Sequence, residues 1–243
     1  MMRTLKTPVL WVGLLFVFLM LDMPALRPFF AAVFPGVQPE IYNRASFIEL
    51  FLSHLGLVAV SGVAAAIVGI ALAIFVTRPA GRDFRTIANM LATIGQVFPP
   101  VAVLALAVPA LGFGPRPTIV ALFLYGLLPI LENAIAGIES VPEPLREAGR
   151  GMGLSQYQLL RDIELPLAAP VILAGVRVSV TIGIGTATIG STVGALTFGT
   201  PIFDGLAGNK LPYVLQGAVL VALFAIVTDL LFGLLARRLQ PSG

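Results

Sequence analysis

The chain has 243 residues, of which 58% are hydrophobic and only 11% charged, with a formal net charge of +3. A soluble domain carries roughly 25% charged residues, so this chain has too few to cover a surface in water and is expected to lie in a membrane. The absence of cysteine and the single histidine exclude disulfides and a multi-histidine metal site within the chain. The charge is also not clustered as a nucleic-acid-binding face requires.

The N-terminal segment carries Arg3 and Lys6 ahead of an apolar run from Val9 to Leu21. A signal peptide has this form, but the Asp-Met-Pro at 22–24 offers no small-residue cleavage site. We therefore expect a retained first span over about residues 7–23. The following segment is rich in proline and aromatic residues and is expected to be irregular or interfacial, so that residues 1–50 comprise an N-terminal span and an external loop.

Five further apolar stretches are long enough to cross a bilayer as helices. They cover residues 52–76, 87–111, 118–138, 167–195 and 212–235. The first of these is full of glycine and alanine, which favours close helix packing. In the second, Pro99 and Pro100 remove two backbone donors and should bend or break the helix. The sequence thus predicts an all-α, polytopic transmembrane bundle of about six spans, with the transmembrane domain over residues 51–238.

The distribution of Lys and Arg predicts the orientation of these spans. With six spans and a cytoplasmic N-terminus, ten basic residues lie on the inner side and four on the outer side. The inner set is Arg3, Lys6, Arg78, Arg82, Arg85, Arg146, Arg150, Arg161, Arg237 and Arg238, and the outer set is Arg27, Arg44, Arg116 and Lys210. This excess obeys the positive-inside rule and predicts that both termini and residues 139–166 are cytoplasmic.

The polar interval between the fourth and fifth spans has a specific spacing. Glu147-Ala148-Gly149 is followed by three residues, Gly153, nine residues, Ile163, and then Leu165-Pro166. This pattern resembles the "EAA" loop of ABC importer permeases, with Gly149 where that family usually has a second alanine. The resemblance implies two short helices joined near Gly153, which dock on a cytoplasmic ATPase and carry the force of ATP binding into the membrane. An ordinary cytoplasmic loop is the alternative interpretation.

Within this predicted coupling loop, side-chain chemistry suggests individual roles. Apolar contacts to the ATPase would come from Leu145, Ala148, Met152 and Leu154, and charged contacts from Glu147 and Arg150. The glycines at 149, 151 and 153 would allow the bend between the two helices. Alternating access would then move the fifth span, which is attached at Pro166.

Other segments resemble the osmoprotectant permeases, most closely the glycine betaine uptake permeases of enteric bacteria. They are Gly95–Pro115, Leu165–Arg177, Ile184–Ala195 and Gly199–Pro201. The resemblance implies the type I ABC importer permease fold and a location in the bacterial inner membrane. It also implies a second permease subunit, identical or paralogous, two ATPases that bind ATP and magnesium, and a periplasmic or lipid-anchored binding protein. The expected cargo is an osmoprotectant such as glycine betaine or choline.

The sequence offers nothing on which an enzyme could be built. A P-loop needs a Gly-Lys pair, and the two lysines, Lys6 and Lys210, follow Leu5 and Asn209. No metal or cofactor site is expected in this chain, so ATP hydrolysis would take place on a separate subunit. An ion-coupled secondary transporter would show inverted repeats and intramembrane carboxylates and would not need the loop motif. A type I permease for an amino acid or another small solute remains an alternative.

Residues of the translocation pathway or its gate are harder to identify. The candidates are Pro99, Pro100, Arg177, Thr186 and Thr188. Arg177 lies about ten residues into the fifth span, at a depth of roughly 15 Å, where a cation faces protein or water. We favour a structural role for it, paired with a carboxylate or with backbone carbonyls, because a positive charge is a poor neighbour for a quaternary ammonium. The two threonines belong to a Gly/Thr stripe that serves either the pathway or close packing, and both interpretations stay open.

Overall fold

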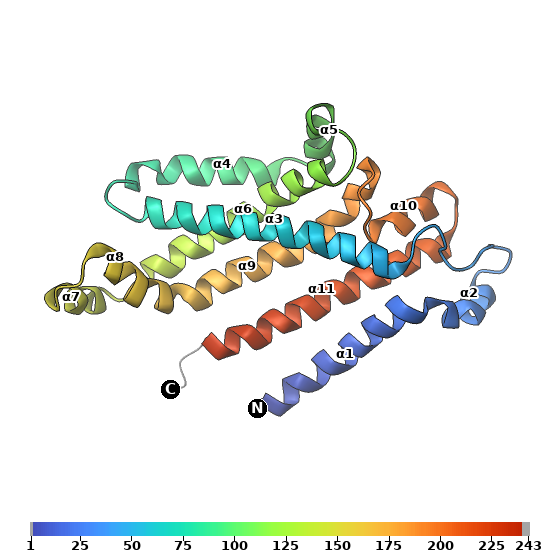
Figure 1. Ribbon diagram of the computed structural model, residues 1–243, viewed down its shortest axis with the longest axis horizontal. Coiled ribbons are helices and arrows are strands. Elements are labelled where there is room, and N and C mark those ends of the chain that lie inside the picture. The colour runs from blue at the N-terminus through green and yellow to red at the C-terminus, as the bar shows by residue number, and fades with distance from the viewer. Residues whose placement is uncertain (1, 240–243) are drawn as a thin grey trace. The chain divides into compact units, whose positions relative to one another are not determined.

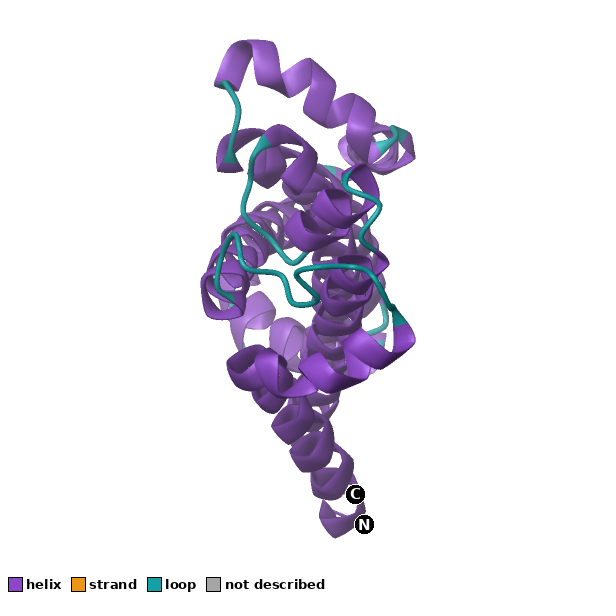
Figure 2. Ribbon diagram, turned by 90° about the vertical axis from the view of Figure 1, so that its right-hand side faces the viewer, coloured by secondary structure: helices purple, strands orange, loops and turns teal. Residues whose placement is uncertain are grey.

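The computed structural model describes residues 2–239, with only the backbone described for residues 2–7 and 239. Arg3 and Lys6, two of the predicted inner charges, therefore lie outside the described side chains. The described residues form helices joined by loops and include no strand (Figure 2). Five helical segments are long and apolar enough to span a membrane, or six if one broken pair counts as a span. The prediction of an all-α polytopic bundle is confirmed.

The helices follow one another along the chain as labelled in Figure 1. The α-helices are α1 (Met2–Asp22), α2 (Arg27–Val33), α3 (Phe47–Val76), α4 (Arg85–Val97), α5 (Pro100–Leu111), α6 (Pro115–Glu139), α7 (Glu143–Gly151), α8 (Gln156–Leu159), α9 (Leu165–Ala187), α10 (Gly199–Ala207) and α11 (Leu211–Leu239). Short 3₁₀ segments cover Met23–Leu26, Arg82–Phe84 and Thr188–Val193, and a π-helical segment covers Leu160–Glu164.

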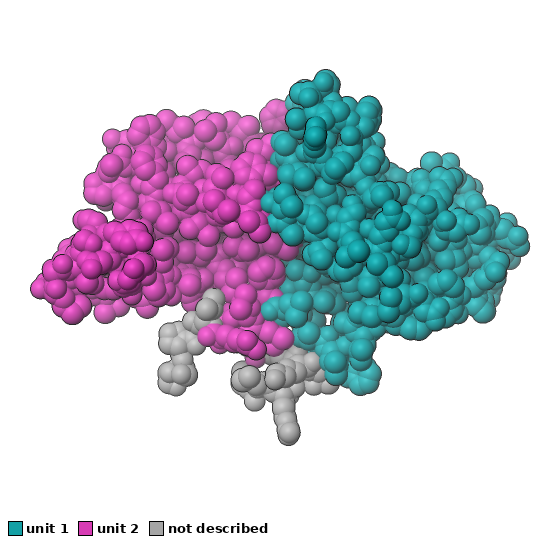
Figure 3. Space-filling view, in the orientation of Figure 1, with its two compact units in different colours: residues 1–61, 99–122, 181–231 teal, residues 62–98, 123–180, 232–243 magenta. Residues whose placement is uncertain are grey.

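The chain forms two compact units, which Figure 3 shows in different colours. Unit 1 contains residues 1–61, 99–122 and 181–231, and unit 2 contains residues 62–98, 123–180 and 232–243. Helices α3, α6, α9 and α11 each contribute residues to both units. The two units are defined by contacts within the chain and do not test the predicted domain boundary after residue 50. That boundary stays a prediction.

Prolines shape two segments of the first hundred residues, one of which was predicted correctly. Residues 23–33, part of the segment expected to be irregular or interfacial, are helical; Pro24 and Pro28 stand at the starts of their helices, where the missing N–H is not needed. The break at the double proline is confirmed: α4 ends at Val97 and α5 begins at Pro100. Phe98, just before Pro99, is extended, and its carbonyl accepts a hydrogen bond from the Tyr125 hydroxyl.

The core of unit 2 brings α3, α4, α6 and α9 together. Its fully or nearly fully buried members are Ala73, Val76, Ala92, Leu128, Leu131, Ala134, Ile135, Ile138 and Ala168. Glycines let the helices approach closely: a Cβ on Gly175 would lie 2.7 Å from the Pro129 carbonyl oxygen, and one on Gly69 would lie 3.0 Å from the Ile130 Cγ2. The predicted close packing of the glycine- and alanine-rich α3 is confirmed.

The core of unit 1 is an aromatic cluster around the single histidine. It consists of Phe16, Phe51, His54, Phe198 and Phe224. His54 is fully buried; its Nε2 lies 3.0 Å from the Ile184 carbonyl oxygen, and its Nδ1 accepts the Phe198 N–H at 3.3 Å. Because an N–H can only donate, Nδ1 is the acceptor and Nε2 carries the proton. The histidine therefore acts as a packed neutral side chain and bridges the end of α9 and the start of α10.

The loop between α2 and α3 is held against α11 within unit 1. Gln216, 1% exposed, accepts the Tyr42 N–H at 3.0 Å and donates to the Glu40 carbonyl oxygen at 2.7 Å. The Tyr42 hydroxyl donates to Asp204 at 3.2 Å. Burial, aided by the charge of Asp204, raises the pKa of Tyr42 to about 12. This loop is thus fixed to the helices by polar contacts.

Candidate functional site: the coupling hairpin

The loop singled out by the sequence folds as a helical hairpin at one end of α9 (Figure 1). Its first helix, α7, ends in a turn in which the Gly153 N–H bonds the Arg150 carbonyl at 2.9 Å and the Leu154 N–H bonds the Gly149 carbonyl at 3.1 Å. Gly153 itself has φ +82°. This pair of bonds around a left-handed residue is a Schellman motif. The predicted bend at Gly153 is confirmed.

The second helix begins with a capping box that the sequence analysis missed. The Ser155 Oγ accepts the Gln158 N–H at 3.3 Å, and the Gln158 side chain accepts the Ser155 N–H at 2.9 Å. The signal was present in the sequence, since a serine followed three residues later by glutamine is typical of a helix start. This box fixes the point at which the chain re-enters a helix after the glycine turn.

The expected start of the fifth span at residue 167 is wrong. The helix that begins at Gln156 continues through the π-helical segment Leu160–Glu164 into α9, with no break at Pro166. In the π-helical turn the Leu165 N–H reaches back five residues to the Leu160 carbonyl. Pro166 comes next and has no N–H, so the return to α-helical bonding leaves no donor unpaired there. The second helix of the hairpin and the fifth span are therefore one continuous rod.

The two arms of the hairpin pack against each other at Gly149. A Cβ on Gly149 would lie 2.8 Å from the Cδ1 atoms of both Leu159 and Ile163. The departure from the family pattern at this position thus accompanies a close approach of α7 to the second arm. Of the three glycines expected to supply the bend, only Gly153 has a positive φ, while Gly151 is helical and an added Cβ there would have no neighbour within 4 Å.

The outer surface of the hairpin exposes large apolar side chains. Leu145 is 45% exposed, Met152 73% and Tyr157 67%. Ala148 and Glu147 are also exposed, whereas Leu154 is only partly exposed. Tyr157 was not among the predicted contacts, because the spacing motif alone did not indicate which face of the second helix is exposed. These three side chains leave apolar surface exposed on an otherwise polar loop.

Two ion pairs link side chains along the first arm. Arg150 donates to Glu143 at 2.8 Å and Arg146 donates to the same carboxylate at 3.2 Å. The hydrogen bond from Arg150, and then that from Arg146, lowers the pKa of the Glu143 carboxyl. Arg150, predicted as a contact to the ATPase, is thus engaged within α7, though it remains exposed.

The candidate pathway residues are distributed over both units. Arg177 is partly buried in unit 2, with its Nη1 4.0 Å from the position of a Cβ on Gly233 of α11. Pro99, Pro100, Thr186 and Thr188 belong to unit 1.

One glycine of the Gly/Thr stripe, Gly190, is closely packed: a Cβ there would lie 2.6 Å from the Thr118 Cγ2. Thr188 donates to the Gly185 carbonyl one turn earlier in the chain at 2.7 Å. Thr186 is partly exposed, and its role stays open.

Known proteins resemble this chain in sequence and in fold. A family described as binding-protein-dependent transport system inner membrane component matches residues 69–241. The osmoprotectant import permease protein OsmY of Salmonella typhimurium is 44% identical over 206 residues, covering 85% of this chain and 87% of the relative. The choline transport system permease protein OpuBB of Bacillus subtilis is 40% identical, covering 83% and 92%.

The fold also matches a solved transporter. A chain of the MetNI methionine ABC transporter in an inward-facing conformation superposes with a TM-score of 0.71 at 21% identity, covering 79% of this chain and 95% of that chain. At this identity the match establishes the fold alone. Together with the family match and the five to six membrane-spanning segments, it places the protein among multi-pass inner-membrane permeases. The chain belongs to the binding-protein-dependent transport system inner membrane component family, as a permease component of an ABC importer.

Proposed function

We propose that this chain is the permease subunit of an ATP-driven importer for osmoprotectants such as glycine betaine or choline. The observation that carries the proposal is the agreement of two relatives, named for osmoprotectants and for choline, at 44% and 40% identity over more than four-fifths of the chain. Substrate would pass from a periplasmic or lipid-anchored binding protein to the cytoplasm by alternating access. The sequence contains no evident aromatic cage of the kind that binds a quaternary ammonium. The pathway through this chain would therefore bind its substrate only weakly.

The hairpin of α7 and α8 is proposed as the contact to a cytoplasmic ATPase that binds ATP and magnesium. Its exposed Leu145, Met152 and Tyr157 can enter a groove of the partner, as an amphipathic helix does in helix-in-groove recognition. Because the second arm continues into α9, displacement of the hairpin would be carried directly into the membrane. Both termini would then be cytoplasmic, and a second permease, identical or paralogous, would complete the pathway.

Reconstitution tests this proposal. The complex would be purified through this chain together with its ATPase and binding protein, and inserted into proteoliposomes. ATP-dependent uptake of radiolabelled glycine betaine or choline, with competition between the two, is expected. Association of the ATPase without uptake of either compound would keep the permease role and overturn the substrate. A complex without any ATPase would overturn the role of the hairpin. Uptake driven by an ion gradient without ATP would favour a secondary transporter.

A further inference from the structure

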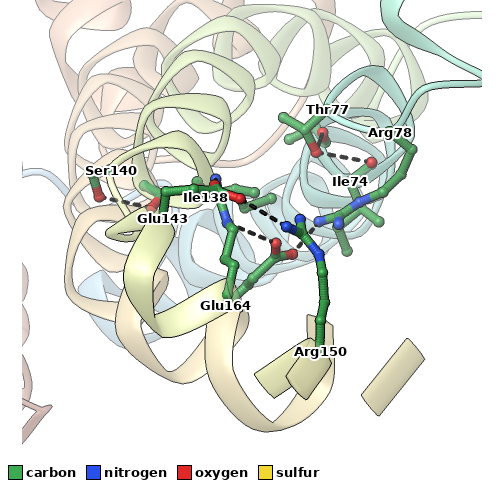
Figure 4. A network of polar contacts seen from close by, with 11 residues as sticks. Ile74, Thr77, Arg78, Ile138, Ser140, Glu143, Arg150 and Glu164 are labelled. Atoms are coloured by element: carbon green, nitrogen blue, oxygen red, sulfur yellow. Dashed lines mark hydrogen bonds and ion pairs between the residues drawn. The ribbon is translucent and has the colours of Figure 1, made fainter. Parts of the chain in front are cut away.

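A buried carboxylate joins three segments of unit 2. Glu164, 2% exposed, lies at the end of the π-helical segment, and its carboxylate forms ion pairs with Arg78 and with the Arg146 Nε, the second at 3.0 Å. Figure 4 shows the Glu164 carboxylate facing Arg78. Arg78 lies two residues after the end of α3, and Arg146 belongs to α7. A buried charge persists only where it is paired, so these contacts determine where Glu164 can be placed.

Glu164 points inward from the end of the π-helical segment. It lies four residues from the partly buried Leu160 and from the fully buried Ala168, and three residues from Arg161. Here the Arg161 side chain is 63% exposed and pairs with Asp162, whereas that of Glu164 is 3% exposed. Both residues belong to the π-helical segment. Such π-bulges occur frequently at functional sites.

Both arginines are held from other directions. Arg146 donates to the Ile138 carbonyl near the end of α6 at 2.5 Å, and also to Glu143. Arg78 begins a tight turn in which its carbonyl accepts the Gly81 N–H at 3.0 Å. A Cβ on Gly81 would lie 2.1 Å from the Phe75 carbonyl oxygen, so the turn is packed directly against the end of α3. Arg78 is therefore fixed to α3 and Arg146 to α6 and α7.

We propose that Glu164 is a positioning residue that transmits movement of the coupling hairpin to α3. The helix from Gln156 onward moves with the hairpin through covalent continuity, but α3 has no such connection. The Glu164–Arg78 ion pair supplies it, and the Glu164–Arg146 pair ties the first arm to the same point. Movement of the hairpin then displaces α3 together with α9. This inference rests on the proposed coupling role of the hairpin. It assigns to Glu164 the ion pairs that link the hairpin to α3.

The test compares charge-neutral variants by their coupling ratio, the substrate transported per ATP hydrolysed. Glu164→Gln keeps the shape of the side chain, whereas Arg78→Gln shortens it, and each removes the Glu164–Arg78 ion pair. In each, ATPase association and hydrolysis are expected to persist, while the coupling ratio falls about tenfold, within the range of measured coupling energies. The double variant should be no worse than Glu164→Gln alone, because Glu164→Gln already removes the pair with Arg78. The control is Arg161→Gln, which breaks the neighbouring exposed pair with Asp162 and should leave the ratio unchanged.

A second readout is independent of the cargo. The chain has no native cysteine, so spin labels can be placed at Asp83→Cys and Asp162→Cys, both exposed and both in unit 2. In the otherwise unaltered complex, the distance between the labels should stay the same when nucleotide is trapped on the ATPase. With Glu164→Gln in addition, the distance should change on trapping, because the second arm moves without α3.

The outcomes separate the two proposals. Absence of uptake by the unaltered complex overturns the osmoprotectant assignment and leaves the label experiment intact. The proposed role of Glu164 in moving α3 is overturned by either of two results. One is an unchanged coupling ratio in Glu164→Gln, and the other is a label distance that responds to nucleotide equally with and without Glu164. Equal losses of ATPase association and transport would also overturn it, since Glu164 would then only maintain the docking surface. If Glu164→Gln does not accumulate in the membrane, Arg78→Gln and Arg78→Lys carry the same test from the other side of the pair, with partial recovery expected for lysine.

Discussion

Replacing Gly153 by alanine isolates the contribution of the glycine turn to the hairpin. Gly153 has φ +82°, and a Cβ added there would meet nothing within 4 Å, so the substitution adds strain without a clash. Gly151, two residues earlier, has equally open surroundings but helical backbone at the end of α7. Gly151→Ala is therefore a matched control: it makes the same chemical change in the same arm, at a position that alanine accommodates.

The expected difference follows from the two backbone conformations. A left-handed conformation costs an L-residue about 1–2 kcal/mol, which Gly153→Ala must bear. Alanine in a helix is favoured over glycine by up to about 1 kcal/mol, which Gly151→Ala gains in part at a helix end. The loss of unfolded-state entropy is common to both substitutions and cancels. The hairpin of Gly153→Ala should thus be less stable than that of Gly151→Ala by about 2 kcal/mol.

Amide hydrogen exchange over residues 143–165 in the purified complex measures this difference. A gap of about 2 kcal/mol corresponds to exchange roughly 30-fold faster in Gly153→Ala than in Gly151→Ala. ATP-dependent uptake should likewise be lower in Gly153→Ala than in Gly151→Ala. Gly153→Asn should lie between the two, because asparagine adopts left-handed conformations more readily than alanine. Equal exchange in both alanine variants would refute the argument that the turn depends on glycine at 153.

Three further substitutions test other contacts. Gly149→Ala should leave ATPase co-purification nearly unchanged, because the added Cβ would meet only the ends of the flexible Leu159 and Ile163 side chains, at 2.8 Å. Gly149→Leu should abolish co-purification. Loss of co-purification with alanine would contradict this reasoning. His54→Ala leaves the buried Ile184 carbonyl and Phe198 N–H without their partner and should destabilise unit 1 on the order of 3 kcal/mol. The measurement is the midpoint of thermal unfolding in detergent, which should fall. An unchanged midpoint would show that neither hydrogen bond contributes to stability. Arg177→Ala should lower the amount of folded protein in the membrane if its role is structural; full accumulation with lost uptake would assign it to the pathway.

The sequence alone determined the fold class, the break at Pro99 and Pro100, and the position of the hairpin, and it predicted about six spans where the structure has five or six. Each is a local property. Apolar runs of sufficient length must form helices in lipid, a proline removes its own donor, and the hairpin motif is a fixed spacing within twenty residues. The glycine turn at 153 could be predicted for the same reason, since the need for a left-handed residue is local.

The tertiary structure decided how the hairpin is joined to the membrane helices. Glu164 lies 86 residues from Arg78, so no local pattern could pair them. The same holds for Gly149, whose packing against Ile163 depends on the second arm folding back, and for His54, whose partners are 130 and 144 residues away. Hydropathy and spacing assign residues to helices. Which buried polar groups meet depends on how those helices pack, because a buried charge or amide is stable only beside its partner.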